Sequence, residues 1–259
     1  MSRLRAKCPD CSTYTAVALG DEYECHVCGR QFAAGLVRVP RAWGDGGESM
    51  AEAARLPLPY PEAAVIEEGS LEEQSLALAA DLPPRPVVLG GCCCSHVGAV
   101  TGLASRHGRV AVIWFDAHGD LNTPESSPSG NQWGMPFRML LDSETVDVAD
   151  VVLVGARNLD PPEEDFIVRS GLRLGSGALD SALEGTGGAY VAFDCDVLEP
   201  AEFASFMPEP DGLTLSQAEE FLAAVRARTS VLGLGITGAV AEPENVPRLA
   251  RLTAALGLD

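Results

Sequence analysis

The sequence predicts an α/β protein with a mostly parallel, doubly wound sheet, preceded by a small cysteine-rich segment. Short apolar runs alternate with segments of helical periodicity, which is typical of strands connected by helices. The runs are apolar at every position, as expected of strands that are buried on both faces. Two Cys-x-x-Cys pairs within the first 28 residues set the N-terminal segment apart from this pattern.

The cysteine pairs define the first element. Cys8 and Cys11 are followed, after thirteen residues, by Cys25 and Cys28. Four thiolates presented by two tight turns can surround one Zn²⁺ ion tetrahedrally, so we predict a zinc ribbon with a structural zinc ion over residues 1–40. Two disulfides are the alternative, and the start of the sequence has no signal-peptide pattern that would favour them.

The next segments follow in order along the chain. Residues 41–69 are rich in Gly and Pro and have few periodic apolar positions, which is typical of a linker or wrapping segment. The main domain is expected over residues 70–259, and Ser70 with Glu73 predicts a capping box on a helix that extends to about Leu82. Further strands are predicted at 86–91, 109–115, 151–154, 172–174, 190–193 and 231–236, and helices near 97–107, 135–142, 161–170, 177–184, 214–228 and 243–256.

The charge is unevenly distributed. The formal net charge is −19, and residues 1–43 hold six basic and four acidic side chains, so the remainder is strongly acidic. An acidic domain repels nucleic acid and anionic membranes and favours small cationic substrates, although solubility alone is an equally good explanation. No apolar stretch is long enough for a membrane span, and we expect a cytoplasmic protein. Lys7 is the single lysine, which excludes a Schiff-base lysine in the main domain.

Residues with metal-binding chemistry follow three of the predicted strands. Ligands of such sheets bind beyond the carboxyl ends of the strands. If the chain stays extended after residue 115, Asp116, His118 and Asp120 point the same way, and Asp194 and Asp196 form a similar pair. Cysteines and a histidine lie in the third segment, which covers residues 90–96.

Four carboxylates at one sheet edge would repel one another unless cations neutralise them. Two divalent metal ions about 3.5 to 4 Å apart, which together activate a water molecule, are the simplest solution. Oxygen ligands with one imidazole suit Mn²⁺ best, with Co, Ni, Fe and Zn as alternatives. The competing interpretation is that these acidic residues only cap helices.

These motifs resemble those of the ureohydrolase family, which includes arginase, agmatinase, formiminoglutamase and guanidinobutyrase. The resemblance covers roughly residues 86–257 and implies an arginase-type fold that hydrolyses guanidino or formimino carbon–nitrogen bonds, usually with two manganese ions. The matching segments are Leu89–Gly91 with Gly98, Asp116–Thr123, Ser129–Pro136, Ala192–Pro200 and Asp211–Ser216.

The resemblance also implies roles for the metal-binding residues. Asp116 and Asp194 would bridge both metal ions, and His118 and Asp196 would complete one site. Asp120 would bind the other ion and accept a hydrogen bond from the attacking water, so His118 and Asp120 are the catalytic candidates.

The substrate positions are carried over in the same way. Asp160, in a loop that begins at Val154, would contact the amino group of an amino-acid-like substrate. The positions that would hold the carboxylate end of the substrate are Asn122, Thr123, Ser129 and Asn131.

The first departure from the family pattern lies at the metal. Cys93 stands where the family has a histidine ligand, and Cys94 and His96 are close enough to substitute for it. A thiolate binds Zn²⁺, Fe²⁺ or Co²⁺ well and suits Mn²⁺ less. This metal site is therefore expected to be altered, weakened or empty.

Two further departures concern the substrate. Trp133 replaces an arginase histidine that is thought to shuttle a proton, so it would wall the pocket or stack on a planar cation. Around Thr237 the family's guanidinium-binding glutamate is missing, with Glu242 as a candidate replacement. A site without that carboxylate should discriminate poorly in favour of a charged guanidinium.

We therefore predict a metal-dependent hydrolase of a linear guanidino, amidino or formimino carbon–nitrogen bond, with a modified arginine-like or other small amino compound as substrate. One alternative is a deacetylase-like amide hydrolase with a single metal at Asp116, His118 and Asp194. The other is a non-catalytic paralogue whose ribbon serves protein assembly. Because the front of the family domain is missing or rebuilt, a homo-oligomer is left open.

Overall fold

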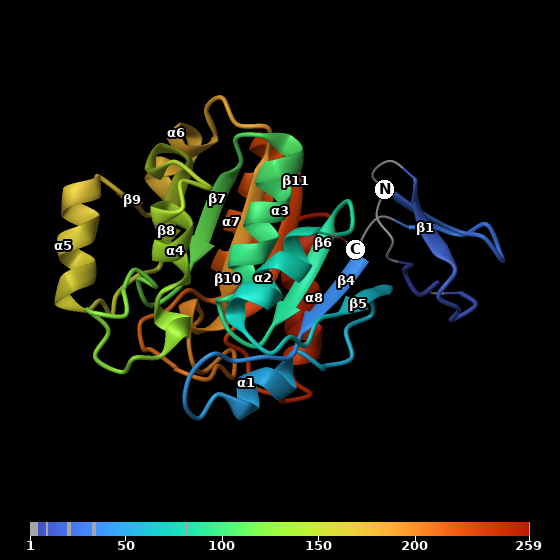
Figure 1. Cartoon of the computed structure of the whole chain (residues 1–259), viewed down its shortest axis with the longest axis horizontal. Coiled ribbons are helices and arrows are strands. Elements are labelled where there is room, and N and C mark those ends of the chain that lie inside the picture. Colours follow the sequence, from blue (N-terminus) through green and yellow to red (C-terminus); the bar gives the residue numbers. More distant parts are fainter. Residues whose placement is uncertain (1–4, 9, 20–21, 33–34, 81, 259) are drawn as a thin grey trace.

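The computed structural model describes residues 5–8, 10–19, 22–32, 35–80 and 82–258, so residues 1–4, 9, 20–21 and 33–34 of the expected ribbon lie outside the described residues. The chain forms two sheets. An antiparallel sheet has the order β1-β2-β3 and comprises β1 (Ala16–Leu19), β2 (Glu22–Cys25) and β3 (Gln31–Phe32). It lies beside the edge of the larger sheet that carries β4 (Gly35–Val39) and β5 (Glu62–Val65) (Figure 1).

The larger sheet has eight described strands in the order β5-β4-β6-β11-β10-β7-β8-β9, and the described neighbours pair in parallel. This confirms the predicted fold class. Its strands are β4 (Gly35–Val39), β5 (Glu62–Val65), β6 (Pro86–Gly90), β7 (Ala111–Phe115), β8 (Val151–Val154), β9 (Arg173–Leu174), β10 (Ala189–Asp194) and β11 (Val231–Thr237).

Helices cover both faces of the large sheet (Figure 1). Side chains of β7 alternate between two cores. Ile113 and Phe115 pack with α7 (Leu215–Arg228) and α8 (Asn245–Ala255). Val112 and Trp114 pack with α2 (Leu71–Ala80), α3 (Ser95–His107) and α4 (Pro136–Asp142). Burial on both faces explains why these strands are apolar throughout. The helices are α1 (Glu48–Ala53), α2 (Leu71–Ala80), α3 (Ser95–His107), α4 (Pro136–Asp142), α5 (Pro161–Ser170), α6 (Leu179–Leu183), α7 (Leu215–Arg228) and α8 (Asn245–Ala255).

The start of the main sheet differs from the expected domain boundaries at residues 40 and 69. Strand β4 begins at Gly35 and pairs with β6, and the expected linker contains both α1 and β5. Arg38 interrupts the apolar run of β4, where its guanidinium binds the Glu62 carboxylate at 2.8 Å and the carbonyl oxygens of Ala54 and Leu56. A charged residue neutralised by partners from another segment breaks the local pattern from which a buried strand is recognised.

The ribbon packs against strand β5. The backbone N–H of Lys7 donates to the carbonyl of Glu62 at 2.8 Å, and the hydroxyl of Tyr14 donates to the Glu62 carboxylate at 2.7 Å. These contacts cover part of an edge strand whose backbone groups would otherwise be open to pairing with another chain. None of the described helices is long and apolar enough to cross a membrane.

Candidate metal centre

Four strands of the large sheet bring the candidate ligands together. The adjacent order β6-β11-β10-β7 places the carboxyl ends of these strands side by side. Asp116 follows β7, Asp194 ends β10, Thr237 ends β11, and Cys93 lies in the turn between β6 and α3. A cavity of about 210 Å³ opens above them.

The ligand candidates form two overlapping triads. One consists of Cys93, Asp116 and Asp120, and the other of Asp116, His118 and Asp196, with the ligand atoms of each triad within 4.8 Å of one another. His118 Nδ1 lies 3.0 Å from Asp196 Oδ2 and 3.4 Å from Asp116 Oδ1. Asp116 is thus shared by the two triads.

The remaining predicted ligand, Asp194, lies at the same place. The thiol of Cys93 donates to Asp194 Oδ2 at 2.9 Å, and the backbone N–H of Asp196 donates to Asp194 Oδ1 at 3.0 Å. Gly238 lines the cavity beside Asp194, so close that a Cβ there would come within 2.0 Å of Asp194 Oδ1. The structure therefore brings all six predicted ligand residues into one cluster.

The hypothesis of an extended chain from residue 116 to residue 120 is wrong, because this segment turns. The N–H of His118 donates to Asp116 Oδ1 at 2.7 Å, and Asp120 has a left-handed backbone with φ 53°. Gly119 packs so closely on Glu163 that a Cβ would lie 2.7 Å from Glu163 Oε1. Hydrogen bonds of this turn, rather than strand alternation, gather the three side chains.

Burial and mutual repulsion control protonation in the cluster. Burial, together with the charge of Asp116, raises the pKa of Asp194 to about 6 and that of Asp120 well above its usual range. Burial alone would lower the pKa of His118, but the carboxylates of Asp116 and Asp196 raise it to about 12. Without a cation, the cluster therefore retains protons that a metal ion would displace.

One unsatisfied atom supports the fit of metal ions to this cluster. Asp120 Oδ2 is a buried side-chain atom with no hydrogen-bond partner among the described residues. Such an atom costs about 1–3 kcal/mol if nothing binds it. Carboxylate oxygens, an imidazole nitrogen and a sulfur together form a donor set for divalent transition metals, with Asp116 available to both ions.

Cys93, and not Cys94 or His96, faces the carboxylates. Cys94 is fully buried in a small cluster with Cys92 and Met50. His96 is fully buried and directs its two ring nitrogens to Tyr190 and Thr237. Neither Cys94 nor His96 takes part in the two triads, so the structure offers no support for either as a substitute for Cys93.

The predicted substrate residues divide into two groups. Asn122, Ser129, Trp133 and Asp160 line the cavity together with described residues of other loops. Asn122 Nδ2 donates to Asp160 Oδ2 at 2.8 Å, which holds two of them together. Trp133 forms a wall, and its ring meets that of Phe206 edge to face at 5.8 Å.

The other two predicted substrate residues, Thr123 and Asn131, are not among the described residues that line this cavity. Asn131 Oδ1 instead accepts a hydrogen bond from the N–H of Asp45 at 2.9 Å, and so holds the segment after β4 in place. The Thr123 N–H donates to Ser126 Oγ at 2.8 Å within its own loop. Their role in substrate binding stays a prediction, because the direction of a loop side chain depends on contacts that spacing does not reveal.

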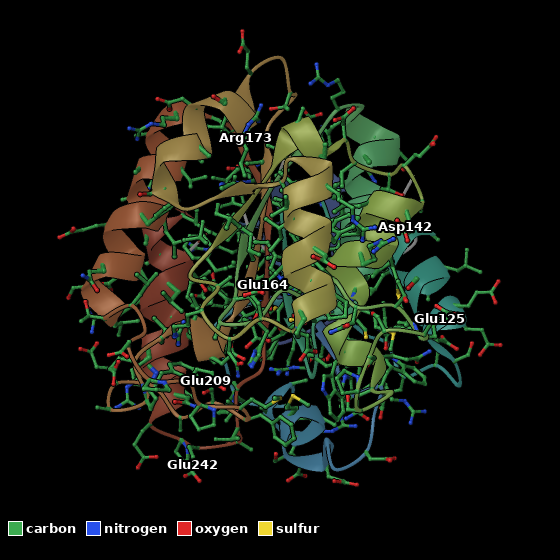
Figure 2. All side chains as sticks on the ribbon, turned by 90° about the vertical axis from the view of Figure 1, so that its left-hand side faces the viewer. Glu125, Asp142, Glu164, Arg173, Glu209 and Glu242 are labelled. Atoms are coloured by element: carbon green, nitrogen blue, oxygen red, sulfur yellow. The ribbon has the colours of Figure 1, made fainter. Side chains whose placement is uncertain are left out.

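Sequence reasoning missed several residues at the site, including Met50, Phe206, Met207 and Glu209. Glu209 Oε1 lies 3.7 Å from His118 Nε2, and Figure 2 shows it at the same end of the molecule as Glu242. Glu242 itself is exposed and outside the set of described residues that line the cavity. The signal for Glu209 is only a Pro-Glu-Pro loop, which is positioned by Arg157 through the carbonyl oxygens of Glu209 and Pro210.

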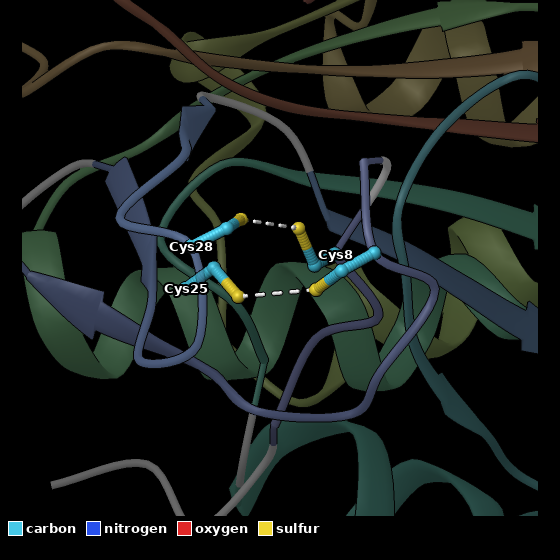
Figure 3. A group of neighbouring side chains, drawn as sticks. Cys8, Cys25 and Cys28 are labelled. Carbon is cyan, nitrogen blue, oxygen red and sulfur yellow. Dashed lines mark hydrogen bonds between the residues drawn. The ribbon is translucent and has the colours of Figure 1, made fainter.

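The four ribbon cysteines form a separate cluster (Figure 3). The sulfurs of Cys8 and Cys28 are 3.5 Å apart and those of Cys11 and Cys25 are 3.6 Å apart. A disulfide requires about 2.05 Å, whereas tetrahedral zinc with bonds of about 2.3 Å separates its sulfurs by roughly 3.8 Å. The arrangement fits one zinc ion better than two disulfides.

A parallel α/β sheet with a cluster of acidic side chains at its carboxyl edge is typical of a metal-binding α/β protein, and the comparisons with known proteins identify the family. The sequence profile of the arginase family matches residues 57–240, and the chain belongs to this family. The arginase of Bacillus caldovelox is 35% identical over 175 residues, which cover 56% of this chain and 58% of that protein. The arginase of Staphylococcus aureus (strain COL) is 34% identical over 142 residues, or 45% of this chain and 47% of that protein. The chain thus spans about half the length of the curated relatives that it matches.

Solved structures show the same fold at lower identity. The native arginase from Bacillus caldovelox has a TM-score of 0.73 at 22% identity, covering 87% of this chain and 97% of that one. An Entamoeba histolytica arginase in complex with L-ornithine has a TM-score of 0.74 at 19% identity, covering 86% and 97%. The proclavaminate amidino hydrolase from Streptomyces clavuligerus has a TM-score of 0.68 at 20% identity, covering 87% and 92%.

Proposed function

We propose that this chain is a metal-dependent hydrolase of a linear carbon–nitrogen bond in a guanidino, amidino or formimino compound. The observation that carries the proposal is the sharing of Asp116 by two ligand triads on the floor of one cavity. A fold and family shared with arginases support the same conclusion. The ribbon zinc would be structural, because four thiolates leave no open position for water.

Two divalent ions, with Mn²⁺ as the first choice and Zn²⁺, Fe²⁺, Co²⁺ or Ni²⁺ as alternatives, would lower the pKa of a water molecule and stabilise the charge that develops on the substrate. His118 Nδ1 faces the carboxylates and would be its ligand atom. Asp120 Oδ2 has no other partner among the described residues, so it would take the proton from the attacking water and pass it to the leaving nitrogen.

The cavity lining supports a small amino compound as substrate. Asp160 and Asn122 offer a carboxylate and an amide to an amino-acid-like ligand, and a relative of the same fold was solved in complex with L-ornithine. Strand β11, however, where the family pattern would supply a glutamate for the guanidinium, carries no carboxylate, and its one polar side chain is the buried Thr237. We therefore favour a modified arginine, for example an N-hydroxylated one, over arginine itself.

The one-metal alternative has a specific observation in its favour. The sequence predicts this single site at Asp116, His118 and Asp194, whereas the triad of oxygen and nitrogen donors in the structure is Asp116, His118 and Asp196. Asp194 instead accepts a hydrogen bond from the Cys93 thiol. One core metal ion per chain, together with activity on acylated amines, would support a deacetylase-like amide hydrolase. Two core ions would favour the leading proposal.

The experiment is a substrate panel with protein loaded separately with each candidate metal. Urea or hydroxyurea release from guanidino compounds is expected, and Asp120→Asn should lower kcat by about 100-fold or more because it removes the proton acceptor. Asp142→Asn is a matched control, since Asp142 is exposed and pairs with Arg138. Absence of turnover with every metal would refute the proposal and favour the non-catalytic paralogue. The cytoplasmic location and the homo-oligomer stay predictions.

A further inference from the structure

A line of hydrogen bonds runs through the protein interior behind the metal centre. The hydroxyl of Tyr190 lies 3.0 Å from His96 Nδ1, and His96 Nε2 lies 3.2 Å from Thr237 Oγ1. Thr237 Oγ1 in turn lies 3.1 Å from Cys93 Sγ and 3.2 Å from Asp194 Oδ2. Tyr190, His96 and Thr237 are each 0% exposed, so water does not compete for these contacts. The line ends on two candidate metal ligands.

The direction of each hydrogen bond follows from the available protons. The carboxylate of Asp194 accepts, so the Thr237 O–H donates to it. A hydroxyl has one proton, and Thr237 Oγ1 therefore accepts from the Nε2–H of His96. Burial keeps His96 neutral by lowering its pKa to about 3, which leaves Nδ1 as an acceptor for the Tyr190 O–H.

The fold leaves little freedom to this line. Gly235 in β11 lies directly beneath it, and a Cβ there would come within 2.1 Å of the Tyr190 hydroxyl and 2.4 Å of His96 Nδ1. The indole of Trp114 meets the His96 ring edge to face at 5.1 Å. Close packing of this kind holds the imidazole in one orientation, so Thr237 has a fixed partner on the side away from the metal centre.

Binding of a metal ion changes the hydrogen-bonding role of the Cys93 sulfur. As a thiol it donates to Asp194 at 2.9 Å. A metal-binding thiolate has lost that proton and can only accept, and the Thr237 hydroxyl at 3.1 Å is positioned to donate to it. Groups that hydrogen-bond to metal ligands fix ligand orientation and tune metal affinity.

We propose that Thr237, held by His96 and Tyr190, is a positioning residue of the metal centre: its hydroxyl donates to Asp194 while Cys93 is a thiol, and donates instead to the sulfur of Cys93 when that sulfur binds metal. The inference rests on the proposed metal centre but not on the identity of the substrate. It gives a physical role to the threonine at the end of β11, where a carboxylate for the substrate is missing.

The test uses Co²⁺, because sulfur-to-cobalt charge transfer reports directly on a thiolate ligand. The full-length protein is titrated with Co²⁺ after its ribbon has been filled with zinc, and a Cys93→Ala variant defines the signal that does not come from Cys93. In Thr237→Val, which preserves the shape and removes the hydroxyl, the Co²⁺ affinity of the core should fall about 10- to 100-fold. The charge-transfer intensity per bound ion should also fall.

Three variants separate positioning from packing. Thr237→Ser keeps the hydroxyl and should restore affinity and intensity, whereas Tyr190→Phe removes the far end of the line and should weaken both to a smaller extent. Thr253→Val is the matched control, because Thr253 is also 0% exposed and its hydroxyl bonds only to the helix carbonyl of Leu249 among the described contacts. Its cobalt spectrum should match that of the unmodified protein.

The possible outcomes are distinct. Unchanged cobalt affinity and spectrum in Thr237→Val would overturn the inference, as would a Cys93→Ala spectrum identical to that of the unmodified protein. If Thr237→Val does not fold, equal affinities in Tyr190→Phe and the unmodified protein would overturn it. Weakened cobalt binding in Thr237→Val without turnover of any guanidino compound would support the inference while the proposed function failed.

Discussion

The sulfur of Cys93 lies 2.9 Å from Oδ2 of Asp194, so a thiol from the turn after β6 and a carboxylate from the end of β10 meet within the cluster. Burial and the charge of Asp194 raise the pKa of the Cys93 thiol well above its usual range. A divalent cation would favour the deprotonated thiol instead, because it stabilises the Cys93 thiolate and the Asp194 carboxylate at once. The sulfur of Cys93 is therefore expected to influence which metal ion binds at this position.

Replacing Cys93 with histidine should change metal preference. An imidazole suits Mn²⁺ better than a thiolate does, so we expect Cys93→His to raise the affinity for Mn²⁺ relative to Zn²⁺ by on the order of tenfold. The larger side chain enters a site that is only 3% exposed, and should cost about 1–3 kcal/mol in the free energy of unfolding. Competition titrations and urea unfolding would measure the two effects. A preference equal to that of the unmodified protein would show that Cys93 does not select the metal.

Loss of Asp116 should affect both metal positions. Asp116 belongs to both triads, whereas Asp196 belongs to one. Asp116→Asn is therefore expected to lose both core ions and Asp196→Asn to lose one, while the ribbon zinc is retained in each. Elemental analysis of the unmodified protein and of the two variants gives the number of metal ions bound per chain in each. Retention of two core ions by Asp116→Asn would contradict the shared-ligand arrangement.

The metal-free protein should become less stable as pH rises from about 4 to 6. Burial first, and then the charge of Asp116, raise the pKa of Asp194 from 3.8 to about 6, so the folded state binds more protons than the unfolded state in this range. The stabilisation is present below the unfolded-state pKa and is lost as pH passes the folded-state pKa, at on the order of 1.4 kcal/mol for each pKa unit. Asp120 and Asp196 shift in the same direction.

Urea unfolding at several pH values measures this dependence, and Asp194→Asn is its control. The substitution removes one titrating group and leaves the ribbon unchanged, so the slope of stability against pH should become shallower. A slope that is the same in both proteins would show that Asp194 titrates normally in the metal-free state.

The ribbon should lose its order when its metal is removed. Cys11→Ser removes one of four sulfurs and is expected to abolish zinc binding there, because a segment of this size has too small a core to fold alone. Hydrogen exchange should then speed up in β1–β3 and change little in the central strands β7 and β10. Cys195→Ser is the control, since Cys195 is fully buried in the main core and lies outside the described metal clusters. Equal zinc content in the two variants would contradict the prediction.

The central strands and most helices could be predicted because their signals are local. Strands β6, β7, β8, β10 and β11 are largely apolar runs. Half of the predicted Ser70–Glu73 capping box is present at the start of α2: the Glu73 N–H donates to Ser70 Oγ at 3.2 Å, whereas the Glu73 carboxylate accepts from the Ser70 hydroxyl. Strand β4 escaped prediction because Arg38 is neutralised by Glu62, which lies 24 residues further along the chain. Pairing between distant segments leaves no periodic signal in either one.

Residue types and their positions after predicted strands are enough to predict the chemistry of the metal centre, with five Asp and His side chains and Cys93 as ligands. The two Cys-x-x-Cys pairs predict the ribbon zinc site in the same way. Which neighbouring groups act together depends on the tertiary structure. It directs Cys93 toward Asp194 and His96 toward Thr237, turns Asn131 away from the cavity, and brings Glu209 to 3.7 Å from His118. The reason is physical: residue type fixes which bonds an atom can make, whereas the packing of distant strands and loops fixes which partner lies within reach.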